Sequence, residues 1–348
     1  MTTPDLTPTP MGDDTVRVNR ETVTDANDAG AVVVDMRTLS YIELDRVGAA
    51  MWRALVESGT VSGAIESLLA QFDADRAILE TDLARFVVRL RDIGLIDAEH
   101  EGPPATPAAP DTAADRYLDL LERAVSGFLS TTGMKHAGHR AHGRDVPPDA
   151  VTMIGLVRLR SLRALAERAL ADNVPGDFVE TGVWRGGATI LMRGVLAAHQ
   201  VTDRSVWVVD SFAGLPMPDV ERFPVDEFWT PMGGRLVATL DDVRANFASY
   251  LLLDDQVKFL QGWFKDTLPT APIERIAVLR LDGDLYESTM DSLNNLYHRV
   301  SPGGFVIIDD YNLESCRIAV DEFRATHDIT AEIGVIDWAG VWWQVPPA

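Results

Sequence analysis

Cysteine is almost absent from this chain, since Cys316 is the only one in 348 residues. No intrachain disulfide can form, so a small fold held together by disulfides is excluded and a reducing, cytoplasmic compartment is expected. Cys316 falls in a helical pattern close to a pair of acids. We expect it to be a small core residue rather than a nucleophile, because unpaired cysteines are among the most buried residue types.

Long apolar runs and clusters of basic residues are also missing. No apolar run approaches the roughly 20 residues that a membrane-spanning helix requires. The first 14 residues contain neither a basic nor an apolar segment, so we expect no signal peptide and a disordered stretch over residues 1–15. The formal net charge is −22, which disfavours nucleic acid and anionic membranes as partners because phosphates would be repelled.

What the chain does have is length and apolar content for two folded domains. It is 46% apolar over 348 residues, which is typical of globular proteins with room for more than one core. Residues 100–115 are rich in proline, alanine and acids, a composition that cannot bury a core. We therefore expect a linker there, between a domain at 16–99 and a second at 116–348.

The first half predicts a small α+β domain. Strands are expected at 16–18, 31–36 and 40–43, followed by three helices. The third helix carries one apolar stripe, at Leu79, Leu83, Phe86, Leu90 and Ile93. This order indicates a winged-helix-like module, but residues 1–100 contain nine Arg, no Lys and eighteen acids. Such a surface does not favour binding to phosphates, so we do not expect DNA binding.

The second half contains two apolar runs, at 276–279 and 305–308, that predict buried parallel strands. Acids follow both runs: Asp282 and Asp284 after the first, Asp309 and Asp310 after the second. Open α/β sheets bind ligands at the carboxyl ends of their strands, where these acids would repel one another. A divalent cation would stabilise them, and all-oxygen ligation favours Mg²⁺, Ca²⁺ or Mn²⁺ over zinc. For either acidic pair taken alone, the alternative to metal binding is that the acids cap helices or lie in solvent-exposed loops.

A glycine-rich turn at residues 177–188 (DFVETGVWRGGA) precedes these acids. Gly182 and Gly186 permit close backbone approach to a ligand, but their spacing is not the dinucleotide fingerprint. Glu180, at the end of the preceding strand, would repel a pyrophosphate and suits an amino group. The next strand ends in Asp210, where an acid typically binds ribose hydroxyls. Together these features favour S-adenosylmethionine and a metal that activates a hydroxyl.

Residues 143 to about 327 resemble the macrocin O-methyltransferase (TylF-like) family, Mg²⁺-dependent enzymes that methylate sugar hydroxyls in natural-product pathways. The matching stretches are 143–147, 152–156, 175–188, 210–216, 262–269 and 281–312. The resemblance implies an α/β fold with a Rossmann-like class I S-adenosylmethionine methyltransferase domain. Residues 217–243 mix proline, glycine, aromatics and acids without periodicity and predict a lid that contacts the substrate.

The same resemblance implies roles for individual residues. It places metal ligands at Asp282, Asp309 and Asp310 and a general base at Asp284. It implies cofactor binding by Met153, Glu180, Thr181, Gly182, Val183, Trp184, Asp210, Ser211, Phe212, Gly214, Gly262 and Trp263. Glu180 and Gly182 would hold the methionine part and Asp210 the ribose, with Ser211 and Phe212 beside the nucleoside. Trp263 would stack on adenine or belong to the core.

Residues 16–98 resemble the coenzyme PQQ synthesis protein D (PqqD-like) family. The resemblance rests on the stretch Tyr41–Asp45, Gly48, Met51–Trp52, Asp82–Leu83, Leu90 and Gly94–Ile96. The second aromatic that the family has near Ser40 is absent. Members bind the leader peptide of a precursor as an added strand at the sheet edge. The alternative is a small structural or dimerisation domain.

The two resemblances together imply an S-adenosylmethionine- and Mg²⁺-dependent O-methyltransferase of natural-product biosynthesis. The expected acceptor is a hydroxyl on a ribosomally made peptide, recruited by its leader at the N-terminal domain. One alternative is a sugar O-methyltransferase of a small-molecule glycoside with a structural N-terminal domain, and another is a non-catalytic leader-peptide adaptor. Assembly into a homo-oligomer is left open.

Overall fold

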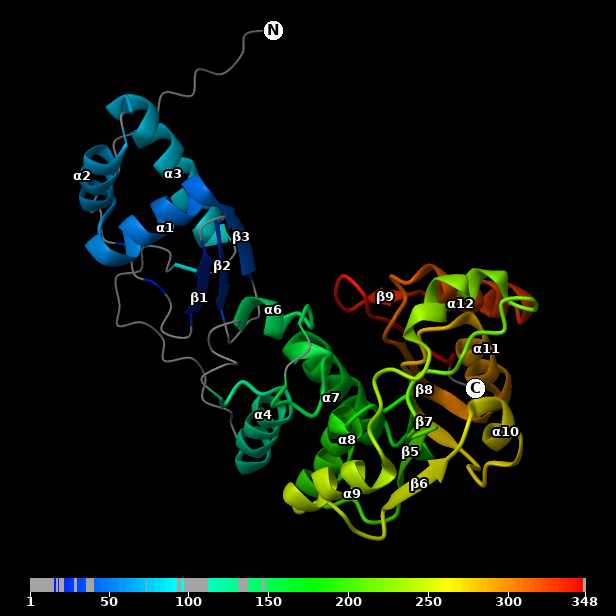
Figure 1. Ribbon diagram of the computed structural model, residues 1–348. Coiled ribbons are helices and arrows are strands. Elements are labelled where there is room, and N and C mark those ends of the chain that lie inside the picture. Colours follow the sequence, from blue (N-terminus) through cyan, green and yellow to red (C-terminus); the bar gives the residue numbers. More distant parts are fainter. Residues whose placement is uncertain are drawn as a thin grey trace, which may run out of the picture. The chain divides into compact units, whose positions relative to one another are not determined.

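The structure is a computed structural model, and it describes residues 16, 18, 22–27, 30–35, 41–72, 74–92, 95–96, 112–130, 137–145 and 148–346 (Figure 1). The stretch expected to be disordered (1–15) and residues 100–111 of the expected linker lie outside the described residues. The chain divides into two compact units, one of residues 1–109 with 135–138 and the other of residues 110–134 with 139–348.

The first unit contains an antiparallel sheet in the order β1–β2–β3 and three helices. Its elements are β1 (Thr22–Asn27), β2 (Gly30–Asp35), β3 (Tyr41–Asp45), α1 (Arg46–Ser58), α2 (Val61–Gln71) and α3 (Arg76–Asp92). Helix α1 begins where the Asp45 side chain accepts a hydrogen bond of 2.8 Å from the amide of Gly48. It ends at Gly59, whose φ of 65° allows the left-handed cap. The winged-helix-like α+β fold is confirmed.

The apolar stripe of α3 faces the core of this unit, since Leu79, Leu83 and Leu90 are buried in it and Phe86 packs against it. Ile93 lies outside the described residues. The expected first strand was misplaced: Val18 forms an isolated bridge with Ile96, and the first strand of the sheet is β1. Polar residues make up most of β1 (TVTDAN), so it lacks the apolar run that marks a strand in sequence.

The second unit has a seven-stranded sheet in the order β6–β5–β4–β7–β8–β10–β9. Its strands are β4 (Asp177–Thr181), β5 (Val206–Asp210), β6 (Val257–Gln261), β7 (Ile276–Leu281), β8 (Val300–Ile308), β9 (Gly334–Val335) and β10 (Val341–Gln344). Strands β4 to β8 pair in parallel, and β10 pairs antiparallel with both β8 and β9. This is the Rossmann-like α/β fold expected of a methyltransferase domain.

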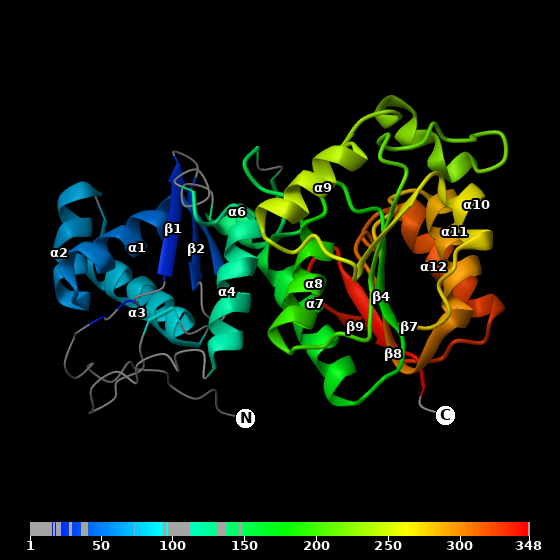
Figure 2. The same cartoon turned by 90° about the horizontal axis from the view of Figure 1, so that it is seen from below.

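Helices cover both faces of this sheet (Figure 2). The helices after residue 110 are α4 (Ala113–Val125), α6 (Ala137–Ala141), α7 (Gly155–Ala171), α8 (Gly187–Ala198), α9 (Leu240–Ser249), α10 (Phe264–Thr267), α11 (Tyr286–Leu296) and α12 (Glu314–Thr326), with 3-10 turns η1 (Pro224–Met232), η2 (Leu268–Thr270) and η3 (Tyr297–Arg299). Helices α7 and α8 lie on one face, and α10 to α12 lie on the other. No helix within the described residues is long and apolar enough to cross a membrane.

The order of the strands indicates where a ligand site is expected in this sheet. The chain runs from β4 outward through β5 to β6, then crosses to β7 on the other side of β4 and continues to β8. The order therefore reverses between β4 and β7, and crevices form at such switch points beyond the carboxyl ends of the strands. Both strands are almost wholly buried because helices cover the two faces, which explains their continuous apolar runs.

Candidate active site

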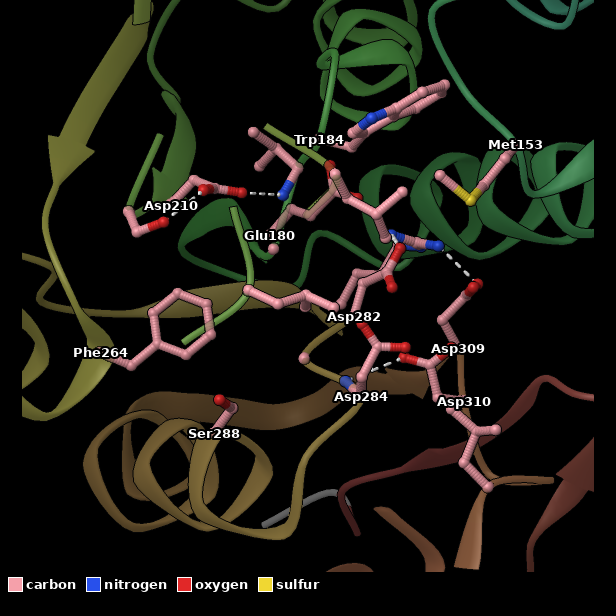
Figure 3. A pocket seen from close by; sticks show the side chains of 18 of the residues that line it. Met153, Glu180, Trp184, Asp210, Phe264, Asp282, Asp284, Ser288, Asp309 and Asp310 are labelled. Carbon is pink, nitrogen blue, oxygen red and sulfur yellow. Dashed lines mark hydrogen bonds and ion pairs between the residues drawn. The ribbon is translucent and has the colours of Figure 1, made fainter. Parts of the chain in front are cut away.

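A cavity of about 600 Å³ opens at the carboxyl ends of β4, β5, β7 and β8 (Figure 3). Eight carboxylates line it, at Glu180, Asp210, Asp282, Asp284, Glu287, Asp291, Asp309 and Asp310, against three cationic side chains, at Arg158, Lys265 and Arg280. The excess of negative charge, enclosed by apolar walls, favours ligands that carry positive charge.

The glycine-rich turn after β4 lies directly against the end of β7. Gly182 has a φ of 82°, and a Cβ there would lie 1.7 Å from the carbonyl oxygen of Asp282. Only glycine fits this position, for reasons of both space and backbone conformation. The turn carrying the cofactor motif and the loop carrying the first acidic pair are thus packed without a gap.

Glu180, at the end of β4, is almost fully buried at the cavity wall. Burial raises the pKa of its carboxyl to about 8, while the nearby guanidinium of Arg280 opposes that rise. One carboxylate oxygen accepts a hydrogen bond from Arg280. The other, Oε2, has no hydrogen-bond partner among the described residues. A buried acceptor of this kind is costly until a donor reaches it, so the site fits a ligand amino group.

Asp210, at the end of β5, connects two turns of the cavity wall. Its Oδ2 accepts a 2.7 Å hydrogen bond from the amide of Val183, and its Oδ1 accepts one of 2.7 Å from the amide of Phe212. Burial raises the pKa of the carboxyl, and these backbone donors counter the rise. A carboxylate has about four lone-pair directions, so the side chain can still accept from ligand hydroxyls.

Three of the four acids after β7 and β8 converge, and Asp309, which was expected to be a metal ligand, is not among them. Carboxylate oxygens of Asp282, Asp284 and Asp310 lie within 4.8 Å of one another (Figure 3). Burial, with added repulsion from Asp282 and Asp309, raises the pKa of Asp284 to about 8. Burial and the same kind of repulsion raise the pKa of Asp310 well above its usual range. A divalent cation among these oxygens would relieve the repulsion, and their number and type suit Mg²⁺.

Asp309 differs from its three neighbours because it is buried between two arginines. Its Oδ2 pairs with Arg158, from α7, and its Oδ1 pairs with Arg280, from β7. Arg280 also pairs with Glu180 and, at 2.9 Å, with Asp282. This buried guanidinium therefore joins the ends of β4, β7 and β8 into one charged network.

The two arginines were missed in the sequence. Arg280 carried a signal, because it is a single charged residue inside an otherwise apolar strand, two positions before Asp282. A charge in such a place must be paired. Arg158 carried none, since charged residues are common along a helix such as α7.

Comparison with known proteins identifies the family. Residues 106–345 match the family model described as macrocin-O-methyltransferase (TylF). The chain belongs to this family. It is an S-adenosylmethionine-dependent O-methyltransferase, and residues 30–96 match coenzyme PQQ synthesis protein D (PqqD).

Curated relatives of this O-methyltransferase include two from Streptomyces. It is 51% identical to an 8-demethyl-8-(2,3-dimethoxy-alpha-L-rhamnosyl)-tetracenomycin-C 4'-O-methyltransferase of Streptomyces olivaceus, over 67% of this chain and 94% of the relative. It is 49% identical to a demethyldecarbamoylnovobiocin O-methyltransferase of Streptomyces niveus, over 69% and 98%. Among solved structures, the O-methyltransferase NovP is 50% identical with a TM-score of 0.65, over 67% of this chain and 99% of that one.

Most residues singled out in the sequence of this O-methyltransferase line the cavity. They are Met153, Glu180, Gly182, Val183, Trp184, Asp210, Ser211, Gly214, Trp263, Asp282, Asp284, Asp309 and Asp310. Three others lie behind its wall. The Thr181 hydroxyl accepts a hydrogen bond from Ser292 in the core, Phe212 packs against Phe259, and the amide of Gly262 donates to the carbonyl of Asp210.

The 217–243 segment, expected to be a lid, supplies further walls of the cavity through Met217, Trp229 and Leu236. Its 3-10 turn η1 is anchored by Asp226, which is fully buried. The Asp226 carboxylate accepts hydrogen bonds of 2.7 and 3.2 Å from the amides of Tyr286 and Glu287, at the start of α11. The segment therefore caps the helix that follows Asp284.

Proposed function

We propose that this O-methyltransferase methylates a sugar hydroxyl of a natural-product glycoside, with Mg²⁺ bound beside the acceptor. The observation that carries the proposal is the convergence of Asp282, Asp284 and Asp310 at the cavity. The curated relatives are named for natural-product acceptors, and one of these names contains a rhamnosyl group. They favour the glycoside acceptor over the peptide acceptor expected from the sequence.

The cofactor would lie along β4 and β5. Glu180 would receive the amino group of the methionine part at Oε2, the buried oxygen that has no hydrogen-bond partner among the described residues. Asp210 would accept from the ribose hydroxyls with its remaining lone pairs. Gly182 lets the ligand approach the backbone of the turn, and Trp263, which is about one-third exposed at the cavity, would lie beside the adenine.

The metal would be held by Asp282, Asp309 and Asp310. The Oδ2 of Asp309 already accepts a hydrogen bond from Arg158, and its Oδ1 forms an ion pair with Arg280. A carboxylate has about four lone-pair directions, so others remain for a cation. Bound there, Mg²⁺ would lower the pKa of an acceptor hydroxyl and fix its direction. The arginines would hold Asp309 in place and limit how far the four acids can spread.

Asp284 would be the general base. Its carboxylate lies within 4.8 Å of those of Asp282 and Asp310, so it would be within reach of an acceptor hydroxyl held at this cluster. The Asp284 carboxylate would take the proton of the acceptor hydroxyl as that oxygen attacks. S-adenosylmethionine would supply the methyl group and, with its carbon–sulfur bond broken, would leave as S-adenosylhomocysteine. The cavity walls need only align oxygen, carbon and sulfur.

Methyl transfer to a small glycoside is therefore expected, and it should depend on a divalent cation. The test is to incubate the full chain with S-adenosylmethionine, Mg²⁺ and a panel of rhamnosylated and other 6-deoxyhexosylated natural products. Mass spectrometry should show the addition of one methyl group, EDTA should abolish it, and added Mg²⁺ or Mn²⁺ should restore it. A metal-stripped enzyme with full turnover would contradict the metal proposal.

A second candidate function is recruitment of a leader peptide by the first unit. The PqqD match over residues 30–96 favours it. So does the sheet, in which β3 pairs with β2 alone among the described residues, leaving one edge able to receive an added strand. Main-chain hydrogen bonds along such an edge give affinity, and tethering raises the local concentration of the acceptor at the second unit.

This candidate predicts that the full chain binds a leader peptide encoded beside its gene. Fluorescence anisotropy with the labelled leader should saturate, and a scrambled peptide of the same composition should not bind. Deleting residues 1–100 should raise the KM for the full precursor and spare turnover of a leaderless glycoside. If the leader fails to bind at high micromolar concentration, the first unit is structural and the glycoside proposal stands alone.

A further inference from the structure

We infer that Trp229, on η1 of the 217–243 segment, is a positioning residue that sets the backbone of Asp284 through a relay of two hydrogen bonds. The indole N–H of Trp229 donates to the hydroxyl of Ser315 at 3.0 Å. That hydroxyl donates in turn to the carbonyl oxygen of Asp284, also at 3.0 Å. The Trp229–Ser315 relay thus runs from a cavity wall to the residue proposed as the base, on which this inference rests.

The backbone of Asp284 needs such support. Its φ of 56° lies in the left-handed region, which aspartate occupies more readily than most residues but still at a cost. The adjoining turn is tight, with the amide of Leu285 donating to the carbonyl of Gly283. A conformation of this kind persists when surrounding contacts over-determine it. The bond from Ser315 to the Asp284 carbonyl is one such contact, made from a different element, α12.

The relay has a fixed support on the 217–243 segment. Asp226 anchors η1 to the first amides of α11, three residues before Trp229 in the chain. Trp229 and Ser315 are both buried, so water does not compete for their hydrogen bond. The segment therefore contacts the elements on both sides of the Asp284 loop. Asp226 binds the start of α11, and Trp229 binds Ser315 of α12.

The same indole lines the cavity, so an acceptor that fills the cavity touches the relay. Packing of an acceptor against Trp229 would favour the arrangement in which its N–H meets Ser315. The Asp284 carboxylate would then be aimed when an acceptor is present. This coupling gives the 217–243 segment a role in the rate of methyl transfer, beyond covering the site.

The test uses Trp229→Phe, which keeps an aromatic ring and removes the N–H, and Ser315→Ala, which removes both bonds. We expect each to lower kcat about tenfold, the effect of one well-placed hydrogen bond, with unchanged affinity for S-adenosylmethionine. In the double variant kcat should fall no further than in Ser315→Ala. Trp207→Phe is the matched control, because its indole donates a similar 2.8 Å bond to Asp177 and neither of these two residues lines the cavity.

Melting temperatures separate positioning from stability. Ser315→Ala alone leaves the Trp229 N–H buried without its partner, so it should melt lowest, and the double variant should recover part of the loss. The inference would be overturned if kcat recovered together with the melting temperature in the double variant, or if kcat were unchanged in Trp229→Phe. The inference would also be overturned if the kcat of the double variant fell by the product of the losses in the two single variants.

Hydrogen exchange distinguishes this inference from the proposed function. Peptides that contain residues 283–287 should exchange faster in Trp229→Phe and Ser315→Ala than in the wild type, and Trp207→Phe should leave them unchanged. A wild type that methylates no glycoside would contradict the proposed function. The exchange experiment still decides whether Trp229 orders the Asp284 loop, and unchanged exchange would overturn that point by itself.

Discussion

Replacing Asp284 by asparagine is expected to lower the rate of methyl transfer about a thousandfold, within the range that a general base contributes. Asparagine keeps the size of the side chain and tolerates the left-handed backbone at this position, but it cannot take a proton. Single-turnover kinetics would measure the chemical step. Calorimetry should show nearly unchanged affinity for S-adenosylmethionine and a smaller change in Mg²⁺ affinity than in rate.

Two further variants serve as controls for this prediction. Asp310→Asn should lose Mg²⁺ affinity and turnover while it binds S-adenosylmethionine, and Asp210→Ala should weaken S-adenosylmethionine binding itself. Asp310 is a cleaner choice than Asp309, because loss of the Asp309 carboxylate would leave Arg158 and Arg280 short of a buried partner. If Asp284→Asn lost Mg²⁺ affinity as strongly as Asp310→Asn, Asp284 would be a ligand and the base would lie elsewhere.

Replacing Arg280 by methionine should destabilise the protein by about 3–5 kcal/mol, the usual result of removing one partner from a buried ion pair. Methionine has a comparable length and buries well, so loss of volume is not the cause. The loss arises because Glu180 and Asp309 would remain buried, and Asp282 partly buried, without their shared cation. Denaturant unfolding of the second unit, followed by circular dichroism, measures the change.

Arg168→Met is the matched control for this change. Arg168 is half-exposed; it pairs with Asp172, donates to the side chain of Gln344 and lies over the Phe305 ring, so its loss should cost only about 1 kcal/mol. Adding Glu180→Gln to Arg280→Met should recover part of the lost stability, because it removes one of the stranded carboxylates. A free energy of unfolding for Arg280→Met equal to that of the control would contradict the network.

The sequence predicted the site best where reactive side chains follow directly after an apolar run that marks a buried strand. Asp282, Asp309 and Asp310 could be placed together because buried parallel strands all end at the same edge of a sheet. The Gly182 turn could be assigned to the ligand site because it too follows the end of a buried strand. The apolar stripe of α3 predicted its buried face, because helical periodicity is a local property of the chain.

Other features depend on partners far away in the chain, which local patterns do not reveal. Arg158 meets Asp309 from 151 residues away, and Trp229 meets Ser315 from 86 residues away. The 217–243 segment looked aperiodic because its order comes from buried bonds such as those of Asp226, and not from a repeating apolar face. Strand β1 was missed because it is held by its register with β2 and has little apolar content.

The contact at Gly182 also constrains how this enzyme could be redesigned. A single added methyl at that position would collide with the Asp282 carbonyl, so the turn cannot retreat to make space for a larger ligand. Donors that carry groups bulkier than methyl would have to find their room elsewhere in the lining, for example at the wall to which Met217 and Leu236 contribute. Library design for new alkylation chemistry should therefore begin on that wall and leave the glycine-rich turn unchanged.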